Sequence, residues 1–360
     1  MVTTRSMSAS AGSNDSLLSA QADSQSESPL FRLLPGEVRR NIYDMVLADF
    51  SDPSPEKRYE DKTCYTRPSY YAPRKTDFNL LLTCRAIYRE CWFLPMTLRE
   101  MTFWLTHQSR APPTERAGDD YARPQASTIS LANRLRHTSD QLGETLELES
   151  IRFFAQMYVL EEGRLHETLS RSPLCHVHFR RLTLTIRHQD WWFWERDEPL
   201  RFEAGWIAKA CEALPATLRE LTIELESLER KKKQIDAIAN KMSERWFFVR
   251  GDGVPLLANA KPGSHHVARW RGSSTWMDER WIRDETDNGV LDYYIASVRF
   301  RLLRNLERDG GMVSPKALEA AKAGEFNERS LRLDLPGAKP MKYSGKASLR
   351  VNSQRWTRVG

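Results

Sequence analysis

The chain has 360 residues, 40% hydrophobic and 28% charged, a composition typical of a globular protein with one large domain or two small ones. The formal net charge is +6, and the ten Lys/Arg and four Asp/Glu from Ser314 onward account for all of it. A neutral body argues against a folded nucleic-acid-binding face, and no stretch reaches the ~20 apolar residues that span a bilayer.

The first part of the chain predicts disorder followed by a helix. Residues 1–28 are Ser-rich and nearly free of large apolar groups, so we expect them to be disordered. Pro35 suits the first turn of a helix that ends near Leu47, because its missing N–H needs no helical partner there. One side of this helix carries apolar residues at helical spacing, namely Val38, Ile42, Met45 and Val46.

This helix belongs to a predicted helical region over residues 29–105. Residues 51–76 hold several Pro, Tyr and charged residues, which is typical of a long loop. An apolar stripe over residues 81–94 predicts a second helix, and residues 101–105 predict a short strand. Residues 106–129 contain Pro, Arg and Asp and are expected to form a linker.

An α/β domain is predicted over residues 130–305. We expect it to open with a helix within residues 130–147 and a strand over residues 151–159, where apolar and polar residues alternate. A further strand is predicted over residues 291–302, near the end of the domain.

The clearest pattern lies in the middle of this domain. Residues 182–186 and 221–225 alternate between apolar and polar, as half-buried strands do, and residues 246–249 predict a third strand. Helical stripes separate these strands, at residues 206–214 and 228–242. This order predicts parallel pairing with crossover helices. The expected fold class is mixed α/β, with N-terminal helices followed by a mainly parallel sheet.

Residues 306–360 are expected to form a mostly disordered basic tail with one short helix near residues 315–323. Both ends of the chain hold little apolar surface. We therefore expect deletion of residues 1–28 and 314–360 to leave the melting temperature nearly unchanged. The five cysteines form no disulfide framework, which favours reduced thiols in an intracellular protein of the cytoplasm or nucleus.

The chain carries no recognisable catalytic motif. It lacks the Gly-x-Ser-x-Gly elbow, the His-Glu-x-x-His zinc motif, the P-loop and the Gly-x-Gly-x-x-Gly pattern. Cys175, His176 and His178 are the best metal candidates, but no second Cys/His pair stands at zinc spacing. We expect no enzyme activity, metal or cofactor. An enzyme whose catalytic residues lie far apart in sequence stays an alternative.

Residues 191–194 read Trp-Trp-Phe-Trp and directly follow a predicted strand. Such a run cannot place every side chain in one core. We favour a lid over the sheet that packs against Trp206, because large aromatic residues mostly serve cores. The alternative is an exposed partner-binding surface. Its contact residues would be Trp191, Trp192 and Trp194. Acidic neighbours argue against nucleic acid stacking on these rings.

Two stretches carry a resemblance to a known family. Residues 34–43 read Leu-Pro-Gly-Glu-Val-Arg-Arg-Asn-Ile-Tyr, and this resembles the Leu-Pro-x-Glu opening of an F-box-like domain. Residues 80–90 read Leu-Leu-Leu-Thr-Cys-Arg-Ala-Ile-Tyr-Arg-Glu and resemble a later helix of that domain. Together with the Arg-His-Gln-Asp-Trp-Trp-Phe-Trp-Glu and Leu-Glu-Arg-Lys-Lys stretches downstream, the chain resembles a family of uncharacterised fungal F-box-like proteins.

The resemblance implies a protein-interaction module. In F-box proteins the N-terminal helices dock on the Skp-type adaptor of a cullin–RING ubiquitin ligase, and a later domain holds the substrate. The residues implied to face the adaptor are Leu33, Leu34, Pro35 and Ile42. Two alternatives from other classes stay open, an enzyme with an unrecognised site and a nucleic-acid-associated protein that uses its basic tail.

Overall fold

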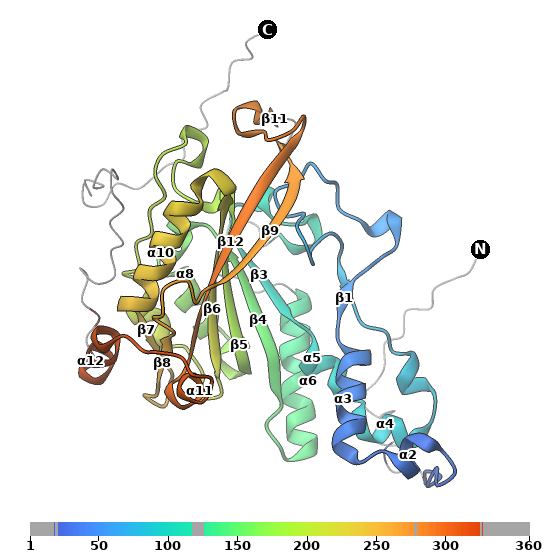
Figure 1. The fold of residues 1–360 in the computed structure, drawn as a ribbon. Coiled ribbons are helices and arrows are strands. Elements are labelled where there is room, and N and C mark those ends of the chain that lie inside the picture. Colours follow the sequence, from blue (N-terminus) through green and yellow to red (C-terminus); the bar gives the residue numbers. More distant parts are fainter. Residues whose placement is uncertain (1–17, 19–20, 117–125, 277–278, 325, 327–360) are drawn as a thin grey trace.

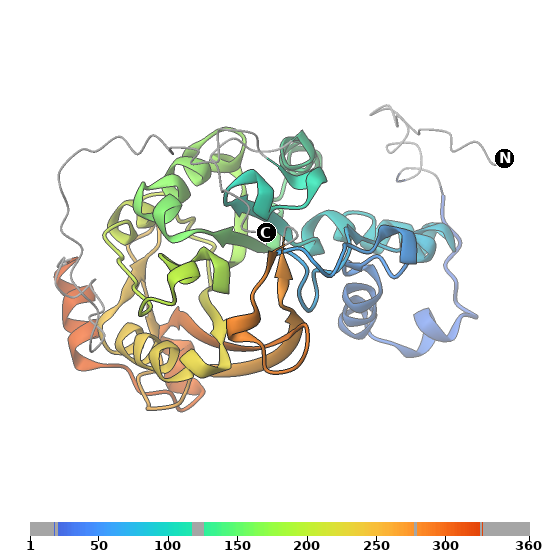
Figure 2. The same ribbon diagram turned by 90° about the horizontal axis from the view of Figure 1, so that it is seen from above.

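The computed structural model describes residues 18, 21–116, 126–276, 279–324 and 326 (Figure 1). It confirms the mixed α/β class. Figure 2 shows the N-terminal helices on one side of the molecule and the sheet with its helices on the other. Within the described ranges, no helix is long and apolar enough to cross a membrane. Most of the expected N-terminal disorder falls outside these ranges.

The central sheet has eight strands in the part of the chain that the structure describes. They are β3 (Met101–Leu105), β4 (Glu147–Ala155), β5 (His178–Ile186), β6 (Glu220–Leu228), β7 (Phe247–Val249), β8 (Pro255–Ala258), β9 (His266–Ser273) and β12 (Val290–Leu302). Their order is β3-β4-β5-β6-β12-β8-β7, with β9 also beside β12. The strands β3 to β6 run parallel, and β12 is antiparallel to β6, β8 and β9.

The predicted parallel pairing is confirmed for β5 and β6, where Leu182 lies beside Leu221. It is wrong for β7, which pairs antiparallel with β8 and is separated from β6 by β12 and β8. The place beside β6 is taken by β12, which comes much later in the chain. The strand predicted over residues 151–159 is also displaced. It begins at Glu147 and ends at Ala155, and helix α7 follows.

Helices cover the apolar side of this sheet. They are α6 (Ala126–Leu142), α7 (Met157–Glu161), α8 (Arg164–Ser170), α9 (Ile207–Cys211) and α10 (Lys232–Arg245). Their buried residues join one core with alternate side chains of the strands, such as Leu184 and Ile223, because side chains of a strand alternate between its two faces. Helix α6 begins at Ala126, inside the residues predicted as a linker.

The other face of the sheet carries both charged and aromatic side chains and is covered by the chain between β1 (Phe50–Ser51) and β2 (Arg74–Lys75). The predicted long loop is therefore irregular but packed. Tyr70 lies edge-on to the ring of Phe154 on β4, with 5.0 Å between centroids, and Arg67 reaches the glutamates of β6.

The N-terminal helices are α2 (Pro29–Leu33), α3 (Gly36–Leu47), α4 (Arg85–Cys91) and α5 (Leu94–Leu98). The helix predicted near residues 35–47 is confirmed as α3. The second predicted helix is divided, because α4 ends at Cys91 and α5 starts afresh with Pro95 in its first turn. The buried residues of this region form a small core of their own, made of Tyr43, Leu47, Ile87, Cys91 and Leu94.

The C-terminal part contains the small hairpin strands β10 (Thr275–Trp276) and β11 (Glu279–Arg280), then α11 (Leu303–Arg308) and α12 (Pro315–Ala323). The predicted helix near residues 315–323 is confirmed. The structure counts against the expectation that the segment from Ser314 onward has little apolar surface to bury, because Ala317 is buried and the ring of Phe326 stacks on Phe247 at 4.5 Å. The rest of the predicted disordered tail lies beyond the described residues.

Candidate interaction surface

Helix α3 is anchored by one side. Tyr43 and Leu47 are 1% and 0% exposed and pack against Ile87, Cys91 and Leu94. Their spacing of four residues places both side chains on the same side of the helix. This side accounts for only part of the apolar residues on α3.

An ion pair joins α3 to α4. The Arg39 guanidinium donates to both carboxylate oxygens of Glu90, at 2.9 Å and 2.6 Å, and the Tyr43 hydroxyl donates to Glu90 Oε2 at 2.8 Å. The Arg39 hydrogen bonds hold the pKa of the Glu90 carboxyl below its ordinary value, whereas burial raises the pKa of the Tyr43 hydroxyl. The two stretches that carry the F-box-like resemblance are therefore bonded to each other.

The apolar residues left over on α3 face outward. We call Val38, Ile42, Met45 and Val46 the α3 stripe. Met45 is 73% exposed, Val38 and Val46 are also exposed, and Ile42 is half-buried. Leu33, just before α3, is 65% exposed. Exposed apolar residues gathered on one side of a helix are typical of an interaction surface.

The structure places the predicted adaptor-facing residues unequally. Leu33 and Pro35 are exposed, whereas Leu34 and Ile42 are half-buried. From the sequence, Met45 was expected only as one of the apolar residues on one side of the helix and not as a contact residue. In the structure Tyr43 and Leu47 lie on the buried side of α3, which leaves Met45 exposed.

The aromatic run at residues 191–194 is not an exposed surface. Trp191 and Trp194 are 2% and 7% exposed, so the surface interpretation is wrong for both. Trp191 Nε1 donates to the Glu226 carbonyl at 2.8 Å, and Trp192, half-buried, donates to Glu161 Oε1 at 2.9 Å. The rings that contact Trp191 and Trp194 include Phe202, Trp276 and Trp281. Trp206, the expected partner of the lid, instead lies beside Phe248, with 6.4 Å between the ring centroids.

Among the described residues, the cysteine and histidines at residues 175–178 have no further potential metal ligand close to them. Cys175, His176 and His178 are exposed, and the chain is in a short 3₁₀ turn up to His176, so the two histidines do not share one extended strand. Across the described ranges, no three His, Cys, Asp or Glu residues gather closely enough to hold a metal ion.

Sequence reasoning missed a buried ionic cluster on the face of the sheet that the segment between β1 and β2 covers. Arg152 Nη1 lies 2.7 Å from Glu224 Oε2, and Arg67 Nη2 lies 3.2 Å from Glu226 Oε2. Trp270 Nε1 donates to the same Glu226 oxygen at 3.1 Å. The available signal was Glu224 within a predicted strand and Glu226 directly after it. These charges pair with one another beneath the covering segment and link it to β4 and β6.

Comparison with known proteins adds no family to this picture. No model of a protein family, no curated protein and no solved structure matches the chain.

Proposed function

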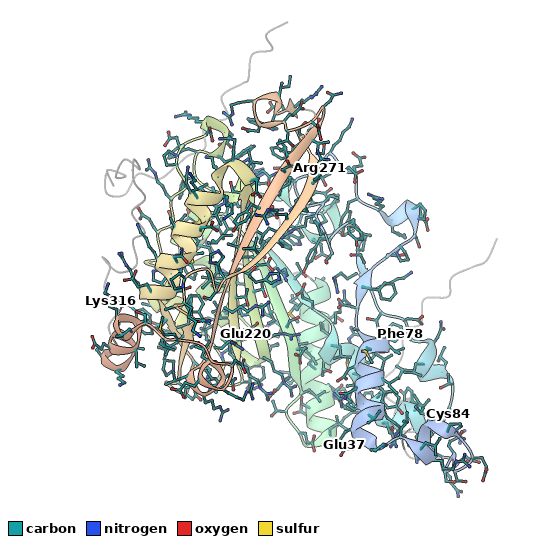
Figure 3. All side chains as sticks on the ribbon, in the orientation of Figure 1. Glu37, Phe78, Cys84, Glu220, Arg271 and Lys316 are labelled. Carbon is teal, nitrogen blue, oxygen red and sulfur yellow. The ribbon has the colours of Figure 1, made fainter. Side chains whose placement is uncertain are left out.

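We propose that the chain is an F-box-like substrate receptor. The α3 stripe docks on the Skp-type adaptor of a cullin–RING ubiquitin ligase, and the α/β part holds the substrate. The observation that carries this proposal is the outward-facing stripe of Val38, Met45 and Val46 beside an inner side fixed by Tyr43, Leu47 and the Arg39–Glu90 pair. Glu37, at the start of α3, marks this region in Figure 3.

The exposed apolar stripe favours binding to a protein partner for an energetic reason. Apolar area left in water forgoes about 25 cal/mol for each Å² that a partner could bury. Met45 is unbranched and adapts to irregular contact surfaces. Because α3 is fixed to α4 and α5 through its other side, docking would cost little conformational entropy of the helix.

The test exchanges one exposed residue on each side of α3 for serine. Met45→Ser should weaken binding of the purified Skp-type adaptor roughly tenfold, because it removes a central apolar contact. Its melting temperature should stay close to that of the wild type, since Met45 is 73% exposed. Ile42 is less suitable, because its half-buried side chain would mix folding and binding effects.

Arg40→Ser is the matched control. Arg40 lies on the other exposed side of α3 and pairs with Asp44 at 2.9 Å, a surface contact worth about 1 kcal/mol or less. Adaptor binding, measured by titration calorimetry, should be unchanged in this variant. Failure of the wild-type chain to bind the adaptor, or equal loss in both variants, would overturn the proposal.

A further inference from the structure

A groove separates the N-terminal helices from α6. Its volume is about 440 Å³. One wall comes from the chain around α4 and α5 and includes Phe78, Leu81, Trp92 and Met96. The other wall is α6. None of the lining residues belongs to α3, so this α4/α6 groove is separate from the α3 stripe.

The two walls differ in chemistry. The wall from the N-terminal helices is mainly apolar, with Arg99 at its end, and Phe78, labelled in Figure 3, is 54% exposed. The α6 wall presents Arg134, His137 and Gln141, all exposed, above the buried Leu131. From residue 131 to residue 141 a helix rises about 15 Å, so the wall is straight and long enough to match several turns of a partner helix.

The groove is positively charged. Its lining contains Arg99 and Arg134 and no Asp or Glu. Both arginines are exposed, and within the part of the chain that the structure describes neither forms an ion pair with an acidic side chain. Many other surface arginines of this protein are paired, for example Arg271 with Asp292 at 3.0 Å. Two unpaired guanidinium groups beside an apolar wall are complementary to a partner that carries both carboxylates and apolar residues.

We propose that the α4/α6 groove binds an acidic amphipathic helix of a partner protein. The apolar side of that helix packs on Phe78, Trp92 and Met96, as in other helix-in-groove complexes. Its carboxylates face Arg99 and Arg134. The inference goes beyond the adaptor proposal and does not depend on it, because the two surfaces share no residue.

The test is a selection of displayed random peptides, each of about 16 residues or four helical turns, on the immobilised full-length chain. We expect enrichment of peptides with apolar residues at helical spacing and with Asp or Glu beside them. Fluorescence anisotropy with a labelled enriched peptide should show roughly tenfold weaker binding to Arg134→Glu, where the charge is reversed. Phe78→Ser should weaken the same binding by removing an apolar contact.

Matched variants separate this proposal from its rivals. Arg136→Glu makes the same charge change on an exposed residue of α6 outside the groove lining and should bind the peptide like the wild type. Met45→Ser should also bind it normally, whatever becomes of adaptor binding. All variants concern exposed residues, and thermal melts confirm that each is folded.

Three results would overturn the proposal. One is a selection that enriches no acidic amphipathic pattern. Another is an enriched peptide that binds Arg134→Glu and the wild type equally. The third is self-association of the wild-type chain that Phe78→Ser abolishes, since the occupant would then be a second copy of this chain.

Discussion

His188 is a titratable residue enclosed in an aromatic cluster. It is 1% exposed, and its ring lies 5.5 Å from that of Trp194 and 6.0 Å from that of Trp276. Burial lowers the pKa of this imidazole from 6.5 to about 3. Between these values the unfolded chain binds a proton that the folded chain does not. The free energy of unfolding therefore falls as the pH falls below 6.5, by about 1.4 kcal/mol per pH unit.

His188→Phe should remove this pH dependence. The variant keeps a ring in the cluster. It removes the imidazole Nδ1 that lies 3.2 Å from the Ser227 hydroxyl, and losing this hydrogen bond lowers the free energy of unfolding by about 1 kcal/mol at every pH. Urea titrations should show the wild type losing roughly 3 kcal/mol relative to the variant between about pH 6.5 and 4.

Comparing the free energies of unfolding of the two proteins at each pH cancels the contributions of the other titrating groups. Glu161 is one of these groups, because burial raises the pKa of its carboxyl to about 7, and its contribution to stability is lost as the pH rises from 4.5 through that value. This change opposes that of His188 in the wild type and is shared by the variant. A difference between the two proteins that stays constant with pH would contradict the prediction.

At the scale of elements, the segment between β1 and β2 is held to the sheet through Arg67. This side chain is 8% exposed, and its Nη1 lies 3.7 Å from Glu224 Oε2 while its Nη2 lies 3.2 Å from Glu226 Oε2. Arg67→Met keeps the apolar stem and leaves the buried Glu226 without this cation. We expect a loss of about 3 kcal/mol in the free energy of unfolding, measured by urea denaturation.

Arg58→Met provides the control for Arg67, since it changes the same residue type on the same segment. Arg58 pairs with Asp61 at 3.3 Å on the surface, and losing this contact should cost less than about 1 kcal/mol. Adding Glu226→Gln to Arg67→Met should recover part of the loss, because the unpaired charge is removed. Equal stability of the two single variants would show that Arg67 does not hold the segment.

Local patterns predicted the strands and helices whose partners are close in sequence. Alternation in β5 and β6 was sufficient because each buries one side under helices, and their parallel pairing followed from the helix between them. The same alternation could not place β12 beside β6, because pairing between distant strands leaves no local signal.

The α3 stripe shows the same limit at the candidate site. Tyr43 and Met45 lie on different sides of the helix, and each side carries further apolar residues, so the sequence could not rank the two sides as buried or exposed. The choice depends on Glu90, 51 residues beyond Arg39 in the chain, which bonds the side of α3 that turns inward. For the aromatic run the favoured expectation of burial agrees with Trp191 and Trp194, which are buried. The turn that Phe193 makes between Trp192 and Trp194, with a φ of 54°, was not predicted.

At the scale of the whole molecule, α12 closes the end of the sheet at β7. Helix α12 contacts β7, β8 and α10, and the ring of Phe326 stacks on Phe247. A chain that ends at Val313 would expose Phe247 and Leu257, which form a core cluster with Ala317. Losing these contacts should cost about 2–4 kcal/mol of apolar burial. It would also bare β7 as an edge strand.

Two truncated chains test this contribution, one ending at Phe326 and one ending at Val313. Both lack residues 327–360, so their difference reports only α12 and the residues that flank it. The longer chain should melt several degrees higher in a calorimetric scan, as expected for a difference of about 2–4 kcal/mol in a chain of this size. The shorter chain should also aggregate sooner on heating, because its edge strand can pair with other copies. Equal melting temperatures would show that the helix rests on the sheet without stabilising it, and that β7 and β8 are secured by α10 and β12 alone.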